Sequence, residues 1–167
     1  MNNEEEIQKY LVDLENNDSQ IRNIARHKLA SIGPEAVPDL IQQLKTDRER
    51  CRWEAAKILG DIPDDEAAAE ALVEALMDNS ISVHWVATES LIKHGQSAIL
   101  PLLEGLTRHF DSMRFRQGAY HILHMLERFH KLDPKVQEVL EALRDIEASV
   151  RAPWAAEHAI EHIKFGK

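Results

Sequence analysis

Residues 72–76 read LVEAL, and the same pattern of apolar and polar residues returns at three other places in the chain. LIQQL begins at Leu40, LLEGL at Leu102 and VLEAL at Val139. The first, second and fifth positions of this five-residue phrase share one face of a helix. Recurrence of one helical phrase every thirty or so residues indicates an internal repeat.

The residues after the phrase repeat as well, with an Arg or His followed by Ala three positions later and Leu seven positions later. Apolar residues at this spacing also lie on one face of a helix. Turn residues such as Gly33-Pro34 and Pro63 separate this helix from the next phrase. Each repeat is therefore predicted to contain two helices. The first carries the Ala and Leu, and the second carries the five-residue phrase. The four triplets are Arg22-Ala25-Leu29, Arg52-Ala55-Leu59, His84-Ala87-Leu91 and Arg116-Ala119-Leu123.

Two short helices cannot bury an apolar face alone, so successive pairs must stack side by side. We therefore predict an all-α fold, a right-handed α-solenoid of about five helical hairpins, in a single domain. The last segment resembles a first helix without its partner. The expected units are an N-terminal half-repeat at 1–17, repeats at 18–47, 48–78, 79–110 and 111–145, and a C-terminal capping helix at 146–167.

Composition limits the classes of partner. The net charge is −9, and it falls in the first half of the chain: residues 1–84 hold nine Lys/Arg against eighteen Asp/Glu, whereas residues 85–167 hold eleven of each. This acidity disfavours nucleic acid and anionic membranes as partners. The N-terminus lacks the features of a signal peptide, and no apolar run approaches the roughly 20 residues that span a bilayer. We expect a cytoplasmic protein.

Three segments resemble a known family. They are GPEAVPDLIQQL at 33–44, CRWEAAKILGDI at 51–62 and SVHWVATESLIKHG at 82–95. They are similar to HEAT repeats, specifically the short HEAT-like repeats of the phycobilisome (PBS) lyase family. The resemblance covers roughly residues 18–164, and it implies an armadillo-like helical solenoid in which the second helices line a concave surface.

The Arg or His of each repeat resembles the ladder position of such repeats. Arg22, Arg52, His84 and Arg116 occupy this position, and Arg151 follows them in the last segment. An Asp precedes each of them, so stacked Asp and Arg residues can cap helix starts and pair between layers. A structural role is expected for this ladder. The preceding residues are Asp18, Asp47, Asp78, Asp111 and Asp145.

The third position of the phrase lies opposite the buried face. It is occupied by Gln42, Glu74, Glu104 and Glu141. On the concave surface these residues would form an acidic stripe, because the fourth positions beside them are mostly small. Such a stripe fits a protein partner with a basic segment. The alternative is a solvated helix face on which Glu serves helix propensity alone.

Trp53 and Trp85 occupy equivalent positions of two successive repeats, directly after the ladder residue. Both project away from the centre of the apolar face, so they are candidates for an interaction patch. Burial between adjacent layers is the alternative. His158 and His162 are one helical turn apart and are weak candidates for binding a divalent metal; we predict no metal site.

Motifs of catalysis are missing from the sequence. The HEAT-like deoxyhypusine hydroxylases bind iron through repeated His-Glu dipeptides, and this chain has none. It also lacks a Gly-rich nucleotide loop and a GxSxG motif. We therefore predict no enzyme, no catalytic residue and no cofactor. The predicted function is that of a monomeric or weakly dimeric adaptor or scaffold that binds a protein on its concave face. The alternative is an accessory subunit of a cofactor-processing enzyme, such as a bilin lyase-like protein.

Overall fold

The computed structural model describes residues 3–166. Ten α-helices and two short 3-10 helices, η1 and η2, make up this part of the chain. The elements are α1 Asn3–Asp13, α2 Ser19–Ile32, η1 Gly33–Ala36, α3 Val37–Gln43, α4 Glu49–Leu59, α5 Glu66–Ala75, α6 Ile81–His94, η2 Gly95–Ala98, α7 Ile99–Arg108, α8 Met113–Phe129, α9 Pro134–Leu143 and α10 Ala148–Phe165.

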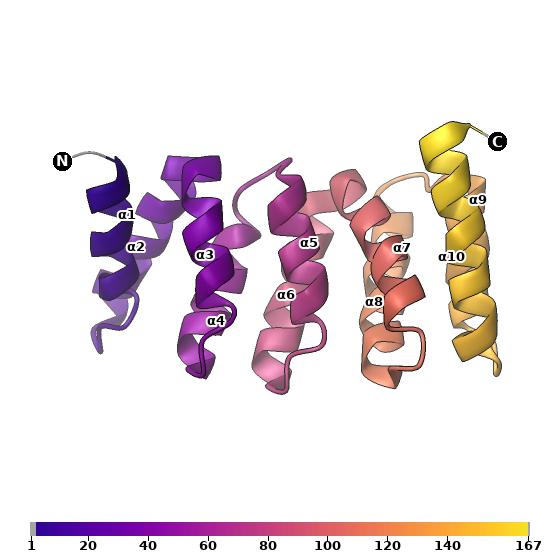
Figure 1. The fold of residues 1–167 in the computed structure, drawn as a ribbon, viewed down its shortest axis with the longest axis horizontal. Coiled ribbons are helices and arrows are strands. Elements are labelled where there is room, and N and C mark those ends of the chain that lie inside the picture. The colour runs from indigo at the N-terminus through magenta and orange to yellow at the C-terminus, as the bar shows by residue number, and fades with distance from the viewer. Residues whose placement is uncertain (1–2, 167) are drawn as a thin grey trace.

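The helices stand side by side in two rows (Figure 1). Helices α1, α3, α5 and α7 form the second-helix row, which faces the viewer, and α2, α4, α6 and α8 form the first-helix row behind it. Each layer packs on the next within both rows and across them. This arrangement confirms the predicted all-α solenoid.

Local sequence signals set the ends of the helices. Asp65 and Ser112 accept hydrogen bonds from backbone N–H groups in the first turns of α5 and α8, and so act as N-caps. Gly33 and Gly95 end α2 and α6 with φ angles of 75° and 63°, a conformation that favours glycine. The chain then makes one 3-10 turn before the next helix begins. These glycines therefore produce the sharp reversal inside two of the hairpins.

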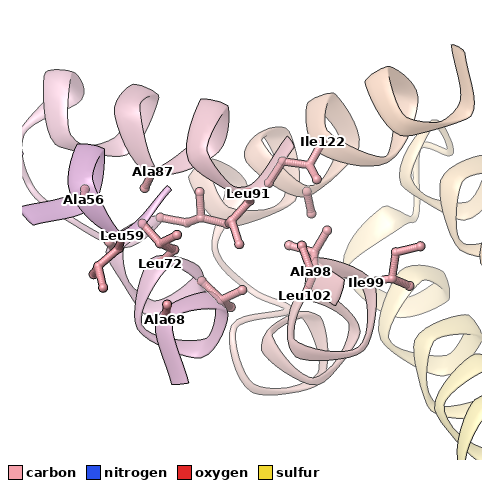
Figure 2. Packing of buried hydrophobic residues seen from close by; sticks show 14 of the residues in the cluster. Ala56, Leu59, Ala68, Leu72, Ala87, Leu91, Ala98, Ile99, Leu102 and Ile122 are labelled. Atoms are coloured by element: carbon pink, nitrogen blue, oxygen red, sulfur yellow. The ribbon is translucent and has the colours of Figure 1, made fainter. Parts of the chain in front are cut away.

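The core is continuous along the row of layers, and the repeated residues form it. Leu40, Leu72, Leu102 and Val139, which open the four phrases, are all fully buried. Between them lie the leucines of the first helices and small residues, among them Ala56 and Ala87 (Figure 2). Each layer therefore covers the apolar face of its neighbour, as the repeat predicts.

The last layer departs from the expected order. Helix α10 packs along α7 and α9, whereas α9 packs against α8. In Figure 1, α10 therefore continues the second-helix row, and α9 stands behind it in the first-helix row. The expectation that α10 follows as a first helix was wrong. The phrase VLEAL lies on α9 and so belongs to the opposite row from its three counterparts.

The buried face of α10 offers a physical reason for this exchange. Its buried residues are all alanines, Ala152, Ala155, Ala156 and Ala159. The distance between packed helices depends on the side chains at the contact, so an alanine face lets two neighbours approach closely. Helix α10 thereby fits beside α7, in the place that a second helix occupies in the other layers.

Neighbouring layers approach each other closely at the end of α4. A Cβ atom at Gly60 would lie 2.3 Å from the Ser90 hydroxyl oxygen and 2.9 Å from Ser90 Cα. Ser90 donates a hydrogen bond to the carbonyl of Ala56 at 3.0 Å, and His94 Nε2 donates one to the carbonyl of Leu59 at 3.0 Å. The last turn of α4 therefore finds partners for its carbonyls on α6 and has no room for a larger residue.

We predict that Gly60→Ala lowers the free energy of unfolding by about 1–3 kcal/mol, because the added methyl group overpacks this contact. Urea denaturation measures the change. Gly118→Ala is the matched control, since its nearest neighbour would be a side-chain atom of His84 at 3.1 Å, and we expect a smaller loss. Equal stability of Gly60→Ala and the natural protein would contradict the prediction.

Candidate functional site

A groove of about 620 Å³ opens on the second-helix row between α3 and α5. Its apolar lining comes from both helices and from the turn after each of them. The charged residues at the groove are Lys45, Glu70, Glu74, Asp78 and Arg108. The apolar lining residues are Ile41, Leu44, Ala67, Ala71, Ala75 and Met77.

The sequence of α5 explains the groove. Ala67 and Ala71 occupy positions where larger side chains would fill the space toward α3. Helix α3 is also short, since it begins only after the turn η1 and ends at Gln43. The groove therefore arises from small side chains on one helix and the early end of the other.

Glu74 lines this groove, but a cation already holds its carboxylate. Arg108 donates a hydrogen bond to Glu74 at 2.8 Å, and His109 Nε2 lies 3.0 Å from it. Burial raises the pKa of Glu74, but the hydrogen bonds from Arg108 and His109 outweigh it, so the pKa is lower than usual. Both partners come from the end of α7, one layer further along.

The other members of the predicted stripe lie in different settings. Gln42 is exposed on α3, and Glu104 on α7 is partly buried and bonded to Lys164 of α10. Glu141 is exposed but lies on α9, and it bonds with Arg144 three residues later. Because α9 is in the first-helix row, Glu141 does not extend the line of Gln42, Glu74 and Glu104. The predicted four-residue stripe is therefore wrong at its last member.

The charge of the chain separates by row. Helices α1, α3, α5 and α7 carry nine Asp/Glu against two Lys/Arg, a net charge of −7. Helices α2, α4, α6 and α8 carry ten Lys/Arg against four Asp/Glu, a net charge of +6. The net charges of the first and second halves of the chain do not reveal this division, because each repeat contributes one helix to each row.

The ladder residues bind the turns that precede their own helices. Arg22, Arg52 and Arg116 each donate a hydrogen bond to the carbonyl six residues earlier. Arg151 instead bonds the side chain of Asp145, and His84 Nδ1 donates to the carbonyl of Leu76 at 2.8 Å. The ladder thus fastens the turn between layers in each repeat.

Pairing between layers, the second predicted role of the ladder, occurs at Arg52. Its guanidinium binds Asp78, in the turn that leads from α5 to α6, through two hydrogen bonds of 2.7 and 3.1 Å. Burial raises the pKa of Asp78, but the hydrogen bonds from Arg52 and from the backbone N–H of Ser80 outweigh it, so the pKa is lower than usual. This one bidentate pair joins two successive layers.

Comparison with known proteins agrees with this geometry. The sequence model of HEAT repeats matches residues 8–92. This chain belongs to the HEAT-repeat family. A search of curated proteins finds no match to the chain. HEAT repeats are general protein-interaction and scaffold modules, and the family is typically non-catalytic.

The two tryptophans of the second and third HEAT repeats differ in exposure. Trp85 is 49% exposed and meets His84 and His121 edge to face, with ring centroids 5.6 and 5.7 Å apart. Trp53 is partly buried against the core, and the guanidinium of Arg26 lies 5.9 Å from the centre of its ring. They occupy equivalent places on α4 and α6 but differ in their neighbours.

A buried carboxylate beside Trp53 escaped the sequence analysis. Glu54 is 3% exposed and faces α2, where Arg22 Nε and Arg26 Nε lie 3.5 and 3.3 Å from its oxygens. Burial raises the pKa of Glu54, and the nearby arginines Arg26, Arg22 and Arg50 oppose this only in part. Glutamate is mostly found at the protein surface, so the sequence alone gives no indication that Glu54 is buried.

The two candidate metal-binding histidines do not converge. His158 lies against Trp154, with ring centroids 4.1 Å apart, and its Nδ1 donates to the Trp154 carbonyl. His162 Nε2 lies 3.4 Å from Asp133. Within residues 3–166, no three His, Cys, Asp or Glu side chains are grouped so as to hold a metal ion. A search of the same residues finds no helix suited to spanning a membrane.

We predict that Arg52→Lys lowers the free energy of unfolding by about 1–3 kcal/mol, because lysine cannot reproduce the two-point contact with Asp78. Chemical denaturation measures the loss. Arg116→Lys is the control. Since Arg116 bonds only to the carbonyl of Phe110 among the described residues, we expect a loss below about 1 kcal/mol. Equal losses in the two variants would contradict a special role for the Arg52 pair.

Glu54 gives a prediction about pH. Because folding raises its pKa, the folded protein binds a proton here more tightly than the unfolded chain does. The contribution of Glu54 to stability therefore falls as pH rises through the window above about 4.3, the usual pKa of Glu. We expect the stability of the natural protein relative to Glu54→Gln to decrease across this window, as measured by urea denaturation at several pH values.

Glu49→Gln is the control of opposite sign. Hydrogen bonds from the hydroxyls of Ser82 and Ser80 lower the pKa of Glu49, so its contribution is present above the usual pKa and is lost as pH falls. The stability of the natural protein relative to Glu49→Gln should therefore increase with pH. The same slope for both variants would show that burial does not govern Glu54.

Proposed function

We propose that this HEAT-repeat chain is a non-catalytic adaptor or scaffold that binds a protein partner on its second-helix row, through a basic segment of that partner. The groove between α3 and α5 is the observation that supports it best, because an apolar depression lies within a row of net charge −7. Apolar contact supplies affinity in such a site, and charge selects the partner and speeds its approach.

The groove suits the side of a helix or extended segment with one aliphatic anchor. Ala67 and Ala71 leave room for the anchor, and Ile41, Leu44 and Met77 provide the apolar contact. Glu70 lies exposed on the same surface and makes no salt bridge among the described residues. A lysine or arginine placed one helical turn from the anchor therefore meets an available carboxylate.

Within the proposed surface, the carboxylates have unequal roles. Gln42 flanks the groove, while Glu74 and Glu104 are bonded to Arg108 and Lys164. A basic partner must compete with these cations or contact them from outside, which weakens the contribution of both glutamates. Glu70 is then the stronger determinant of binding, and Glu141 has no part in it.

The test uses defined probes. A short amphipathic helical peptide of Leu and Lys is labelled with a fluorophore and titrated with the protein, and the same peptide with Glu in place of Lys is its counterpart. We expect saturable binding of the Lys peptide alone. Glu70→Lys should weaken it by about tenfold, because charge reversal replaces attraction by repulsion. Ala71→Arg should eliminate it by filling the groove.

Glu89→Lys, the same charge change on α6 in the first-helix row, is the matched control and should leave affinity within about twofold after correction for salt. Equal weakening by Glu89→Lys and Glu70→Lys would show that overall charge, rather than this groove, attracts the peptide. Copurification of the natural protein with a coloured cofactor, in place of a protein partner, would favour an accessory subunit of a cofactor-processing enzyme.

A further inference from the structure

The first-helix row carries a cluster of arginines around Trp53. Arg22 and Arg26 extend from α2, and Arg50 extends from the first turn of α4. All three lie close enough to Glu54 to oppose the rise in its pKa. One buried carboxylate therefore contacts two guanidinium groups and has a third nearby, so the cluster keeps an excess of positive charge.

The N–H donors of these arginines are only partly used in hydrogen bonds. Arg26 Nε is buried and makes no hydrogen bond among the described residues. It lies 3.3 Å from a Glu54 oxygen and forms an ion pair with it, but not a hydrogen bond. The side chains of Arg22 and Arg26 are 21% and 25% exposed, and Arg50 is exposed. Each guanidinium group carries five N–H donors, so this partly exposed cluster retains donors for a further partner.

Trp53 adds an apolar, planar element to the cluster. The Arg26 guanidinium lies over its ring, and Lys57, which is partly buried like Trp53, follows one helical turn later on the same side of α4. Contact between a cation and the ring fixes the positions of both side chains. Arginines held next to a tryptophan form the pattern that binds the carboxylates of a protein segment, with the ring packing against its aliphatic carbons.

We infer that this surface, made by Arg22, Arg26, Arg50, Trp53 and Lys57, binds an acidic segment of a second protein. The charge of the row supports the inference: α2 and α4 together carry six Lys/Arg against Glu49 and the buried Glu54. The site lies on the opposite row from the groove between α3 and α5. The chain can therefore hold two partners of opposite charge at once and bring them together.

Trp53 itself reports on the test. Trp85→Phe and Trp154→Phe leave Trp53 as the sole tryptophan. A short acidic peptide of Glu and Leu is titrated into this variant, and the emission of Trp53 is recorded. We expect a saturable change in emission that requires higher peptide concentrations as salt is added, because the contact is between charges near the surface. The Lys counterpart of the peptide should produce no change.

Arg50→Glu and Lys57→Glu are the informative substitutions, because neither residue forms a hydrogen bond or a close ion pair within residues 3–166. Each should weaken the acidic peptide by about tenfold. Lys131→Glu, an equal charge change at the exposed turn before α9, is the control and should have little effect. Circular dichroism of each variant verifies that it remains folded.

Three results would overturn the inference: an unchanged Trp53 emission, equal weakening by Arg50→Glu and Lys131→Glu, or tighter binding of a single-stranded oligonucleotide than of the acidic peptide. The last would assign the cluster to phosphate groups of a nucleic acid. Glu70→Lys distinguishes the two surfaces, since it should weaken the basic peptide at the groove by about tenfold and leave the affinity for the acidic peptide unchanged.

Discussion

Burial of apolar surface between successive hairpins is the interaction on which the structure depends. A single hairpin has too little core of its own, and Leu40, Leu72 and Leu102 are fully buried in the stacked array. Polar contacts then fix the spacing of the layers, as Arg52 does with Asp78 and Ser90 with Ala56. The apolar contact provides most of the stability, and these bonds select one arrangement of the layers.

Stacking in two rows also determines where charge can reside. Every internal helix has one face against its partner row and two sides against its neighbours, so only one narrow face remains in contact with solvent. Residues at equivalent positions of successive helices therefore line up on the surface. Charges of one sign on several helices therefore add up along a row. In this way helices α1, α3, α5 and α7 together carry −7, and helices α2, α4, α6 and α8 together carry +6.

Much of the fold was predictable from the sequence, because the periodic residues are the buried ones. The helices, the two-helix repeat and the role of Arg22 and Arg52 at the turns all follow from that periodicity. The position of Glu141 was not predictable, since α9 carries the same phrase as α5 but packs in the other row. The burial of Glu54 also escaped, because it depends on Arg22 and Arg26 reaching across from a helix about thirty residues earlier. The candidate surfaces depend on such contacts and were predicted only in part.

The exchange of α9 and α10 limits how an array of this kind can be lengthened. Among the regular layers, duplication of one hairpin preserves the row to which every later helix belongs, so the number of units can vary without altering the surface chemistry of either row. A hairpin joined directly after α10 would start from the second-helix row, and its acidic and basic helices would change places. Additional hairpins are therefore best inserted before α8, where each later helix keeps its place in the two rows.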